Sequence, residues 1–476
     1  MLRPDLCVIG AGSGGLTVAA AARAFGASVV LVERAKMGGD CLNHGCIPSK
    51  ALIAAARHAE AVRRGPRFGV HAGAPEVDFA QVRAHVRSVI DGLAPHDSVE
   101  RFEGLGVEVI KAEARFVGPR AVEAGGRTIR ARRFVIATGS RPAVPPIRGL
   151  DGVPYLTNET IFEFTERPGH LLVVGGGPVG MELAQAYRRL GSDVTVIEMQ
   201  APLGRDDPEL TAVALKHIAA EGVKVLGRTR VEAVSSSTEG VTLTVREEDG
   251  DRSSERQIAG SHLLLAIGRV PNVESLDPAK AGIRHDRRGI TVDSGLRTSN
   301  RRVYAIGDVS GDLRFTHVAN YHAGLVVRNA LFGLPVTVNH EIIPWATYTD
   351  PEIAQVGLTE HAARQRFGDK IKVVRWSFAE NDRARTARST EGLVKLIADK
   401  KGRILGAGIV GPEAGELIAL FAFAVANRLK ASHLTAFVAP YPTLAEIARR
   451  VGIEFYRDKL ANPWLRRVLA LNRLLP

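Results

Sequence analysis

The sequence has few cysteines, few aromatic residues and no long apolar run, and each shortage excludes a class of protein. Three cysteines in 476 residues are too few for a disulfide-stapled secreted domain. They also leave zinc without ligands, because no second cysteine pair and no histidine pair with finger spacing is present, so no metal site is predicted. The most apolar stretch, residues 417–425, is too short to span a membrane.

Composition and charge narrow the classes of partner. The net charge of +12 is compatible with a nucleic-acid or anionic partner. Aromatic residues make up only 5% of the chain and the arginines are scattered, so no nucleic-acid platform is predicted. Anionic cofactors explain the excess of cations more simply. The N-terminus shows no signal-peptide pattern, and reactive thiols then favour the cytoplasm. The length predicts about three domains.

Two of the three cysteines, Cys41 and Cys46, lie five positions apart within the glycine-rich stretch 38–50. Glycine lets the backbone approach a ligand closely, and Lys50 lies one helical turn beyond Cys46. Such a dithiol can close into a disulfide and reopen. A purely structural disulfide is the weaker interpretation, because a large core gains little from one short loop. The stretch therefore predicts redox chemistry, whereas Cys7, inside an apolar run, is interpreted as core packing.

Two segments show the pattern of a dinucleotide site, which is a buried strand, a glycine turn, a helix and a second strand that ends in an acid. The first begins with the apolar run 6–9 and ends at Glu33, and the second begins with 171–174 and ends at Glu198. The turn residues are Gly10, Gly12, Ser13, Gly14 and Gly15 in the first segment and Gly175, Gly176, Gly177, Pro178, Val179 and Gly180 in the second. The helix N-terminus would face a pyrophosphate and the acid would accept a hydrogen bond from a ribose hydroxyl. Two nucleotides are therefore predicted.

The acid of the second segment also bears on the choice of nicotinamide. A carboxylate at Glu198 would hydrogen-bond an adenine ribose hydroxyl and repel a 2′-phosphate, which favours NADH over NADPH. Arg205 lies a short distance downstream, and its positive charge makes the expected preference for NADH incomplete.

The run Cys-Leu-Asn-x-Gly-Cys-Ile-Pro-Ser-Lys at 41–50 resembles the FAD-dependent pyridine nucleotide–disulfide oxidoreductases. Its wording is most similar to lipoamide dehydrogenase and the mercuric reductase core. Further family-like runs lie at 133–140, 263–272, 303–308 and 411–418, so the resemblance covers nearly the whole chain.

The resemblance implies an α/β fold with two doubly wound Rossmann-like nucleotide-binding domains and a C-terminal α+β dimerisation domain. The implied FAD-binding domain is discontinuous, at 1–148 and 271–340, around an NAD-binding domain at 149–270. The dimerisation domain occupies 341–476, where residues 393–397 alternate as in a strand. A homodimer with active sites across its interface is implied.

Roles for individual residues also follow from the resemblance. Cys46 would contact the flavin, Cys41 would exchange with substrate, and Lys50, paired with Glu182, would lower the pKa of Cys46. The first glycine turn and Glu33 would bind FAD. The other implied FAD residues are Arg34, Gly39, Lys50, Ala114, Thr138, Gly139, Ser140 and Asp308. The implied NAD site comprises the second glycine turn, Glu198, Gly268 and Arg269.

The C-terminal part departs from the family pattern at one position. Lipoamide dehydrogenase and glutathione reductase have a His-Pro-Thr-x-x-Glu run whose histidine and glutamate lie over the partner subunit's disulfide. Here the frame reads Tyr441-Pro442-Thr443-Leu444-Ala445-Glu446. Tyrosine titrates near pH 10 and cannot readily take a thiol proton at neutral pH. A tyrosine in this frame resembles mercuric reductase, although the C-terminal cysteine pair of that enzyme is absent.

The electron acceptor is therefore open at the level of sequence. The preferred interpretation is a lipoamide-type disulfide or dithiol, and the alternative is a metal ion or quinone, which Tyr441 favours. His44 lies between the cysteines. The preferred interpretation is that it is a surface or packing residue, and the alternative is that it substitutes for the missing catalytic base. A flavin-bearing sensor without turnover is disfavoured, because Cys41, Cys46, Lys50 and Glu446 are all intact.

The last segment is a basic amphipathic stretch that begins at Pro463. The apolar residues with helical spacing are Trp464, Leu465, Val468, Leu469 and Leu475, and the cations between them are Arg466, Arg467 and Arg473. A tail of this kind can lie on an anionic membrane. Packing on the chain's own dimer is the favoured interpretation.

Overall fold

The computed structural model describes residues 1–237, 240–249, 252–311 and 313–473. Contacts divide the chain into two compact units. Unit 1 comprises Met1–Gln200 and Val223–Val338, and unit 2 comprises Ala201–Gly222 and Asn339–Pro476. None of the described helices is both long enough and apolar enough to cross a bilayer.

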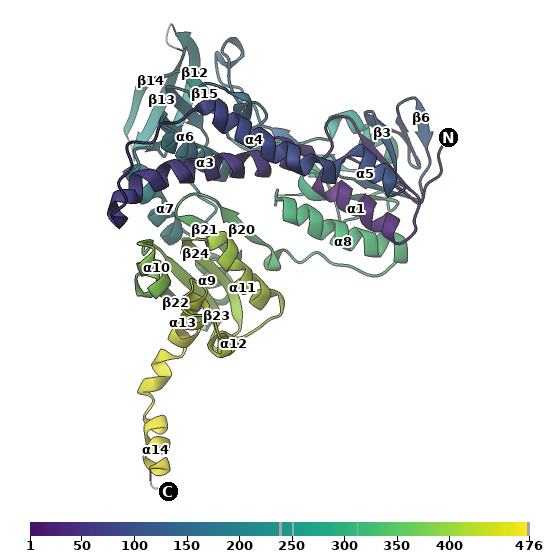
Figure 1. The fold of residues 1–476 in the computed structure, drawn as a ribbon. Helices are drawn as coiled ribbons and strands as arrows, with labels where there is room; N and C mark the ends of the chain where they lie inside the picture. The colour runs from purple at the N-terminus through teal and green to yellow at the C-terminus, as the bar shows by residue number, and fades with distance from the viewer. Residues whose placement is uncertain (238–239, 250–251, 312, 474–476) are drawn as a thin grey trace. The chain divides into compact units, whose positions relative to one another are not determined.

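The first sheet of unit 1 is parallel and has the strand order β19-β7-β1-β2-β3. Its strands are β1 (Leu6–Ile9), β2 (Val29–Glu33), β3 (Glu108–Lys111), β7 (Arg133–Ile136) and β19 (Val303–Ala305). Every residue of β1 and β2 is buried, which explains why these strands are continuous apolar runs instead of alternating ones. Helices α1 (Ser13–Ala24) and α8 (Thr316–Phe332) pack side by side against one face (Figure 1).

The second sheet of unit 1 is also parallel, with the order β11-β10-β9-β15. Its strands are β9 (His170–Val174), β10 (Asp193–Ile197), β11 (Lys224–Leu226) and β15 (His262–Leu265), and α6 (Pro178–Arg189) follows β9. Helices α3 (Cys46–Arg64) and α4 (Phe79–Leu93) run along each other, and α3 also contacts α6 (Figure 1). Thus the segment that carries the cysteines touches the second nucleotide fold.

Smaller elements complete unit 1. Two antiparallel sheets contain β4 (Ala114–Gly118), β5 (Ala121–Ala124) and β6 (Arg127–Ile129), and β12 (Thr229–Ser237), β13 (Gly240–Asp249) and β14 (Arg252–Gly260). Two further short pairs are β8 (Ser140–Pro142) with β16 (Arg269–Pro271), and β17 (His285–Asp286) with β18 (Gly289–Ile290). The remaining helices are α2 (Gly39–Asn43) and α5 (Val99–Gly104). The β8–β16 pair joins the two nucleotide folds at the chain crossings.

Unit 2 is an antiparallel sheet with the order β20-β21-β24-β23-β22 and helices packed against it. The strands are β20 (Pro344–Thr347), β21 (Glu352–Gly357), β22 (Ile371–Ser377), β23 (Leu393–Asp399) and β24 (Ile404–Gly411). The helices are α7 (Pro208–Ala220), α9 (Glu360–Phe367), α10 (Asp382–Thr386), α11 (Ala414–Ala426), α12 (Ala431–Ala436), α13 (Glu446–Phe455) and α14 (Pro463–Asn472). Helix α7 follows β10 in the chain but packs on β21 and β24 of unit 2.

The two units together confirm the α/β fold class that the sequence predicted.

Candidate active site

The two cysteines lie at a helix junction at the carboxyl edge of the first sheet. Cys41 lies in α2 and Cys46 begins α3, with both thiols free and hydrogen-bonded to each other. Gly38 and Gly39 have φ of 82° and 60°, a left-handed conformation that glycine adopts without strain. A Cβ at Gly39 would lie 2.7 Å from the Cα of Gly12, so the loop rests directly on the first glycine turn. The dithiol is thereby held next to the first nucleotide site.

The two thiols differ in acidity. The pKa of Cys46 falls to about 6, chiefly because its sulfur accepts a hydrogen bond from the Cys41 thiol. The hydroxyl of Thr316, 3.3 Å from the Cys46 sulfur, and the charge of Lys50 act in the same direction, whereas burial opposes them. The same hydrogen bond and burial raise the pKa of Cys41. At neutral pH Cys46 is therefore the thiolate and Cys41 keeps its proton.

The Lys50 ammonium lies 2.8 Å from the Glu182 carboxylate. Lys50 belongs to α3 and Glu182 to α6, so this ion pair links the cysteine helix to the second nucleotide fold. The Glu182 side chain is only 6% exposed, which strengthens its attraction for the cation compared with a pair in water. The pair fixes the lysine charge near Cys46.

A further ion pair holds the other side of the cysteine loop. Arg269 lies 3.2 Å from Asp40, the residue just before Cys41, and Asn158 donates to the same carboxylate at 3.1 Å. The Asn158 amide also donates to the His44 carbonyl at 3.1 Å. The negative charge of Asp40 raises the pKa values of both thiols. Arg269 therefore offsets a charge that would otherwise disfavour the thiolate.

The first glycine turn has the shape of a pyrophosphate cradle. A Cβ at Gly10 would lie 2.4 Å from the Ala137 carbonyl oxygen, and one at Gly15 would lie 1.9 Å from the Gly10 oxygen. At Gly12, in contrast, nothing would come closer than 4.0 Å. Two positions thus require glycine for packing and a third leaves the backbone open to a ligand. The Glu33 carboxylate accepts from Ala11 N–H at 2.6 Å, which places it at the edge of this cradle.

The second glycine turn repeats this geometry. A Cβ at Gly175 would lie 2.4 Å from the Ala266 oxygen and one at Gly180 would lie 1.9 Å from the Gly175 oxygen, while the space at Gly177 is open. Glu198 accepts from Gly176 N–H at 2.6 Å. Each carboxylate oxygen retains a second lone pair for a ribose hydroxyl. Pro178 and Val179 form the first turn of α6, at its positive end. Both turns therefore fit a dinucleotide.

A third set of predicted residues lies close together around the β8–β16 pair, where the chain passes between the two nucleotide folds. The Ser140 hydroxyl donates to Asp308 at 2.5 Å, and Arg269 donates to the Ser140 hydroxyl at 2.7 Å. Thr138 donates to the Asn272 carbonyl at 2.7 Å. Gly139 and Gly268 have φ of 65° and 119°, as the turns at the ends of β7 and before β16 require. Asp308 is thereby oriented at the end of β19, at the same sheet edge as the glycine turn.

Two predicted cofactor residues contribute less directly. Arg34 is about half exposed and its guanidinium pairs with Glu113 at 3.2 Å. Ala114 begins β4 and is buried. Both lie beside the acid-bearing end of β2, so they border the first cradle without lining the cysteine loop.

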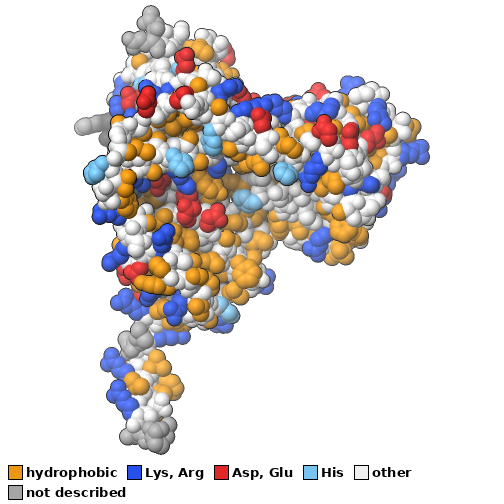
Figure 2. All heavy atoms as spheres, in the orientation of Figure 1, with side chains coloured by type: hydrophobic (Ala, Val, Ile, Leu, Met, Phe, Trp, Pro, Cys, Tyr) orange, Lys and Arg blue, Asp and Glu red, His pale blue; other side chains and the backbone are white. Residues whose placement is uncertain are grey.

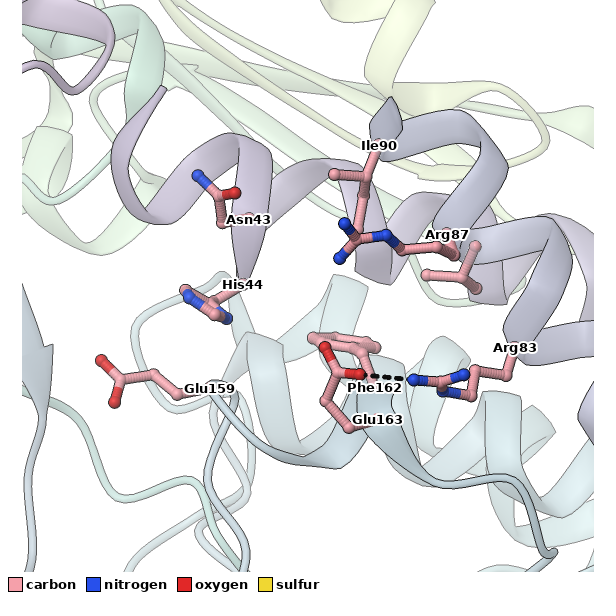
Figure 3. Close-up of a pocket in the computed structure, with 9 residues that line it drawn as sticks. Asn43, His44, Arg83, Arg87, Ile90, Glu159, Phe162 and Glu163 are labelled. Atoms are coloured by element: carbon pink, nitrogen blue, oxygen red, sulfur yellow. Dashed lines mark hydrogen bonds and ion pairs between the residues drawn. The ribbon is translucent and has the colours of Figure 1, made fainter. Parts of the chain in front are cut away.

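His44 lies at the C-terminal end of α2, between the two cysteines in the chain. Its side chain lines a pocket between α2, α4 and the 3₁₀ helix Ile161–Glu163, and neither cysteine is among the lining residues (Figure 3). In this pocket Arg83 pairs with Glu163 at 2.8 Å, and Glu159 lies on the same side of the pocket as His44 (Figure 3).

In unit 2 the Tyr441 phenol is 71% exposed and donates to the Asp382 carboxylate at 3.1 Å. This bond and the Asp382 charge raise the pKa of Tyr441. Glu446 begins α13 and pairs with Arg450 at 3.6 Å. The tyrosine is therefore a hydrogen-bond donor whose bonded partner is Asp382, not the glutamate of the predicted frame.

Sequence reasoning missed Thr316, Asp40, Asn158 and Asp382. Asp40 could have been suspected, since a charged residue directly preceding a redox cysteine must affect it. The other three are 270, 114 and 59 residues from the groups they contact, and no local pattern signals such contacts. Among the described residues, no group of three or more His, Cys, Asp or Glu side chains could hold a metal ion.

Comparison with known proteins agrees with this geometry. Residues 4–323 match the family model of pyridine nucleotide-disulphide oxidoreductases, and residues 343–451 match the dimerisation domain of that family. The chain belongs to the pyridine nucleotide–disulphide oxidoreductase family. As members of this family do, it uses FAD and takes electrons from NAD(P)H, and its dimerisation domain supports homodimer formation.

Relatives within the family have more than one activity. The chain is 38% identical to a mercuric reductase of Streptomyces lividans over 95% of its length and 96% of the relative. It is 39% identical to a dihydrolipoyl dehydrogenase of Thermus scotoductus, over 93% of its length and 95% of the relative. Among solved structures, the HOCl-induced flavoprotein disulfide reductase RclA of Escherichia coli matches with a TM-score of 0.83 at 28% identity, covering 94% and 99% of the two chains. This oxidoreductase is therefore a flavin-dependent disulfide enzyme whose acceptor the family does not specify.

Proposed function

We propose that this oxidoreductase works as an NADH-dependent reductase whose dithiol passes electrons to a thiophilic metal ion. The observation that carries the proposal is the Tyr441 phenol, which donates to Asp382 and has a raised pKa. A group that keeps its proton at neutral pH cannot act as the base that dithiol oxidation needs. A soft metal cation, in contrast, binds thiolates directly and needs no base at that position.

The chain's own residues would carry the dithiol half of the reaction. FAD, held by the first glycine turn with Glu33 and Asp308, would supply the two-electron transfer between NADH and the disulfide. Lys50, held by Glu182, would stabilise the Cys46 thiolate, and Cys41 would hold the second proton until the acceptor arrives. A soft divalent cation would displace that proton, bind both sulfurs and take up two electrons as the disulfide re-forms. NADH and the cation are thus converted to NAD⁺, a proton and the reduced metal.

Two further assignments belong to this proposal. We assign FAD to the first cradle, with Glu33 and Asp308, and NADH to the second, with Glu198. Free thiols that must be re-reduced in each turnover favour a cytoplasmic location.

A lipoyl-type disulfide is the second candidate acceptor. It is favoured by the likeness to a dihydrolipoyl dehydrogenase and by the direction of proton transfer. A protonated Tyr441 could supply a proton to a leaving thiolate during disulfide reduction, although it could not remove one during dithiol oxidation.

The test uses purified, FAD-loaded protein and follows NADH oxidation with a mercuric salt, one ion per NADH, with a cupric salt, two ions per NADH because each takes one electron, and with lipoamide. The reverse reaction is followed as NAD⁺ reduction by dihydrolipoamide. We expect metal-dependent NADH oxidation that requires Cys41 and Cys46, a low dihydrolipoamide rate, and a higher kcat/KM for NADH than for NADPH because of Glu198. Tyr441→His should raise dihydrolipoamide oxidation by up to ~10²-fold, as general-base catalysis allows, without improving metal reduction.

Tyr155→Phe serves as a matched tyrosine control, since Tyr155 packs against the core of the second nucleotide fold. Rapid dihydrolipoamide oxidation by the wild-type protein, with no stimulation by either metal, would refute the proposal.

A further inference from the structure

The chain continues past the part that matches the family. The dimerisation-domain match ends at residue 451, and α14 (Pro463–Asn472) follows. The helix begins with a defined cap, because the Asn462 side chain accepts from Trp464 N–H at 2.9 Å and Pro463 occupies the first turn. It is a formed helix with its own start signal, outside the family's dimerisation domain.

The two faces of α14 differ sharply. At 100° per residue, Trp464, Leu465, Val468, Leu469 and Leu471 share one face, and the arginines at 466, 467 and 473 share the other. Figure 2 shows arginines along one side of this helix and apolar side chains along the other. Trp464 and Leu471 are each 65% exposed, and Leu469 is 52% exposed. Leu475, which the sequence pattern assigned to the same apolar face, lies outside the described residues.

Charge indicates which surface would cover this apolar face. From residue 459 onward the sequence has four cations and no acid. A second copy of this chain also carries a net charge of +12 and therefore offers the arginine face no net electrostatic attraction. An anionic lipid surface complements both faces at once, because lipid phosphates meet the arginines while acyl chains accept the apolar side chains.

We propose that α14 binds the interface of an anionic membrane and attaches the oxidoreductase to it peripherally. With 10 residues the helix is about 15 Å long, too short to cross a hydrocarbon core of about 30 Å, so it lies in the plane of the interface. Trp464 has the amphipathic ring that is typical of that depth. This inference does not depend on which acceptor the enzyme reduces.

The experiment is flotation of the full-length, FAD-loaded protein with vesicles of phosphatidylcholine alone or with about 30% phosphatidylglycerol. We expect roughly tenfold or greater preference for the anionic vesicles, which falls steeply as NaCl rises from about 0.05 M to about 0.5 M. Val468→Asp/Leu469→Asp should abolish binding, whereas the polar-face control Ala470→Ser should not. Arg466→Glu/Arg467→Glu should also abolish it, and Arg466→Lys/Arg467→Lys should retain it.

Every variant should keep wild-type NADH turnover, which separates membrane attachment from failure of the catalytic proposal. Tryptophan emission should shift to the blue on anionic vesicles, and Trp464→Phe should remove that shift. Equal binding of the wild-type protein to both vesicle types would overturn the proposal, as would vesicle binding that the Val468→Asp/Leu469→Asp substitutions leave unchanged. A third result would also overturn it: the wild-type protein fails to bind vesicles, and the Val468→Asp/Leu469→Asp variant sediments as a monomer instead of a dimer. In that case a second copy of the chain covers the apolar face.

Discussion

At the scale of single residues, the site is built from two thiols of opposite character. The sequence placed Lys50 one turn from Cys46 and predicted a lowered pKa from that charge. In the structure the hydrogen bond from Cys41 is the larger cause, and Thr316 also contributes more than the lysine. A neighbour four positions away in a helix can be recognised from spacing, whereas a hydrogen bond between two thiols depends on the loop conformation.

This difference predicts the reactivity of the reduced protein. Alkylation of Cys46 by iodoacetamide should rise with pH around a midpoint of about 6, because only the thiolate reacts and its fraction increases above the pKa. Cys41→Ala removes the main hydrogen-bond donor and should move the midpoint upward. Cys7 is an internal control, because burial raises its pKa to about 12 and it should remain unmodified. Mass spectrometry of quenched samples measures each site, and an unchanged midpoint in Cys41→Ala would contradict the assignment.

Asp40 and Arg269 should shift the same midpoint in opposite directions. Asp40→Asn removes a negative charge that raises the pKa values of both thiols, and should lower the Cys46 midpoint. Arg269→Met leaves that charge uncompensated and should raise the midpoint. Arg141→Met is the matched control, because Arg141 pairs with Glu274 and its loss should leave the midpoint unchanged. Shifts of the same sign in both test variants would show that altered packing, not charge, is responsible.

At the scale of elements, local pattern was enough for the nucleotide folds and insufficient for unit 2. The apolar runs, glycine turns and terminal acids of β1–α1–β2 and β9–α6–β10 lie within short segments, so the sequence alone predicted them. Lys395 is different. Residues 393–397 predicted a strand, but Lys395 is almost fully buried, with its ammonium 2.8 Å from Asp207 and 2.6 Å from Glu209. Those partners are nearly two hundred residues away, where Asp207 caps α7 and Glu209 lies in its first turn, and only the fold brings them to β23.

This cluster should anchor α7 to the sheet of unit 2. Lys395→Met leaves the buried Asp207 carboxylate without its cation, and we expect a loss of about 3–5 kcal/mol, seen as a melting temperature lower by several degrees. Lys280→Met removes an exposed pair with Asp277 and should cost about 1 kcal/mol or less. Equal melting temperatures for the two variants would contradict the anchoring role.

The cluster of Lys395, Asp207 and Glu209 also makes the stability of the fold depend on pH. The pKa of Glu209 falls from 4.5 to about 2, chiefly because Arg375 donates to it, with Lys395 adding to the effect. A carboxyl with a lowered pKa stabilises the fold fully above its ordinary value and progressively less as pH falls toward the folded value. Melting curves of Glu209→Gln and wild type should therefore converge as the pH falls from about 5 to about 2.

At the scale of the whole molecule, the cysteines belong to unit 1 and Tyr441 to unit 2. We infer from the family frame that Tyr441 of one chain serves the Cys41–Cys46 pair of the other in the homodimer. In a twofold dimer each chain would then contribute half of each site. This arrangement could be suggested only by resemblance, since no spacing within one chain indicates which copy completes a site.

Mixed dimers distinguish a shared site from a site within one chain. In a dimer of one Cys41→Ser chain and one Tyr441→Phe chain, a shared arrangement leaves one site wholly wild type, and about half of the acceptor turnover should remain. When both substitutions lie on one chain and the partner is wild type, one site lacks Cys41 and the other lacks Tyr441, so turnover should fall to that of a single Tyr441→Phe site. Two affinity tags purify each mixed dimer, and Tyr441→Phe homodimers must first show a clear loss. The opposite order of activities would place the tyrosine and the dithiol of each site on the same chain.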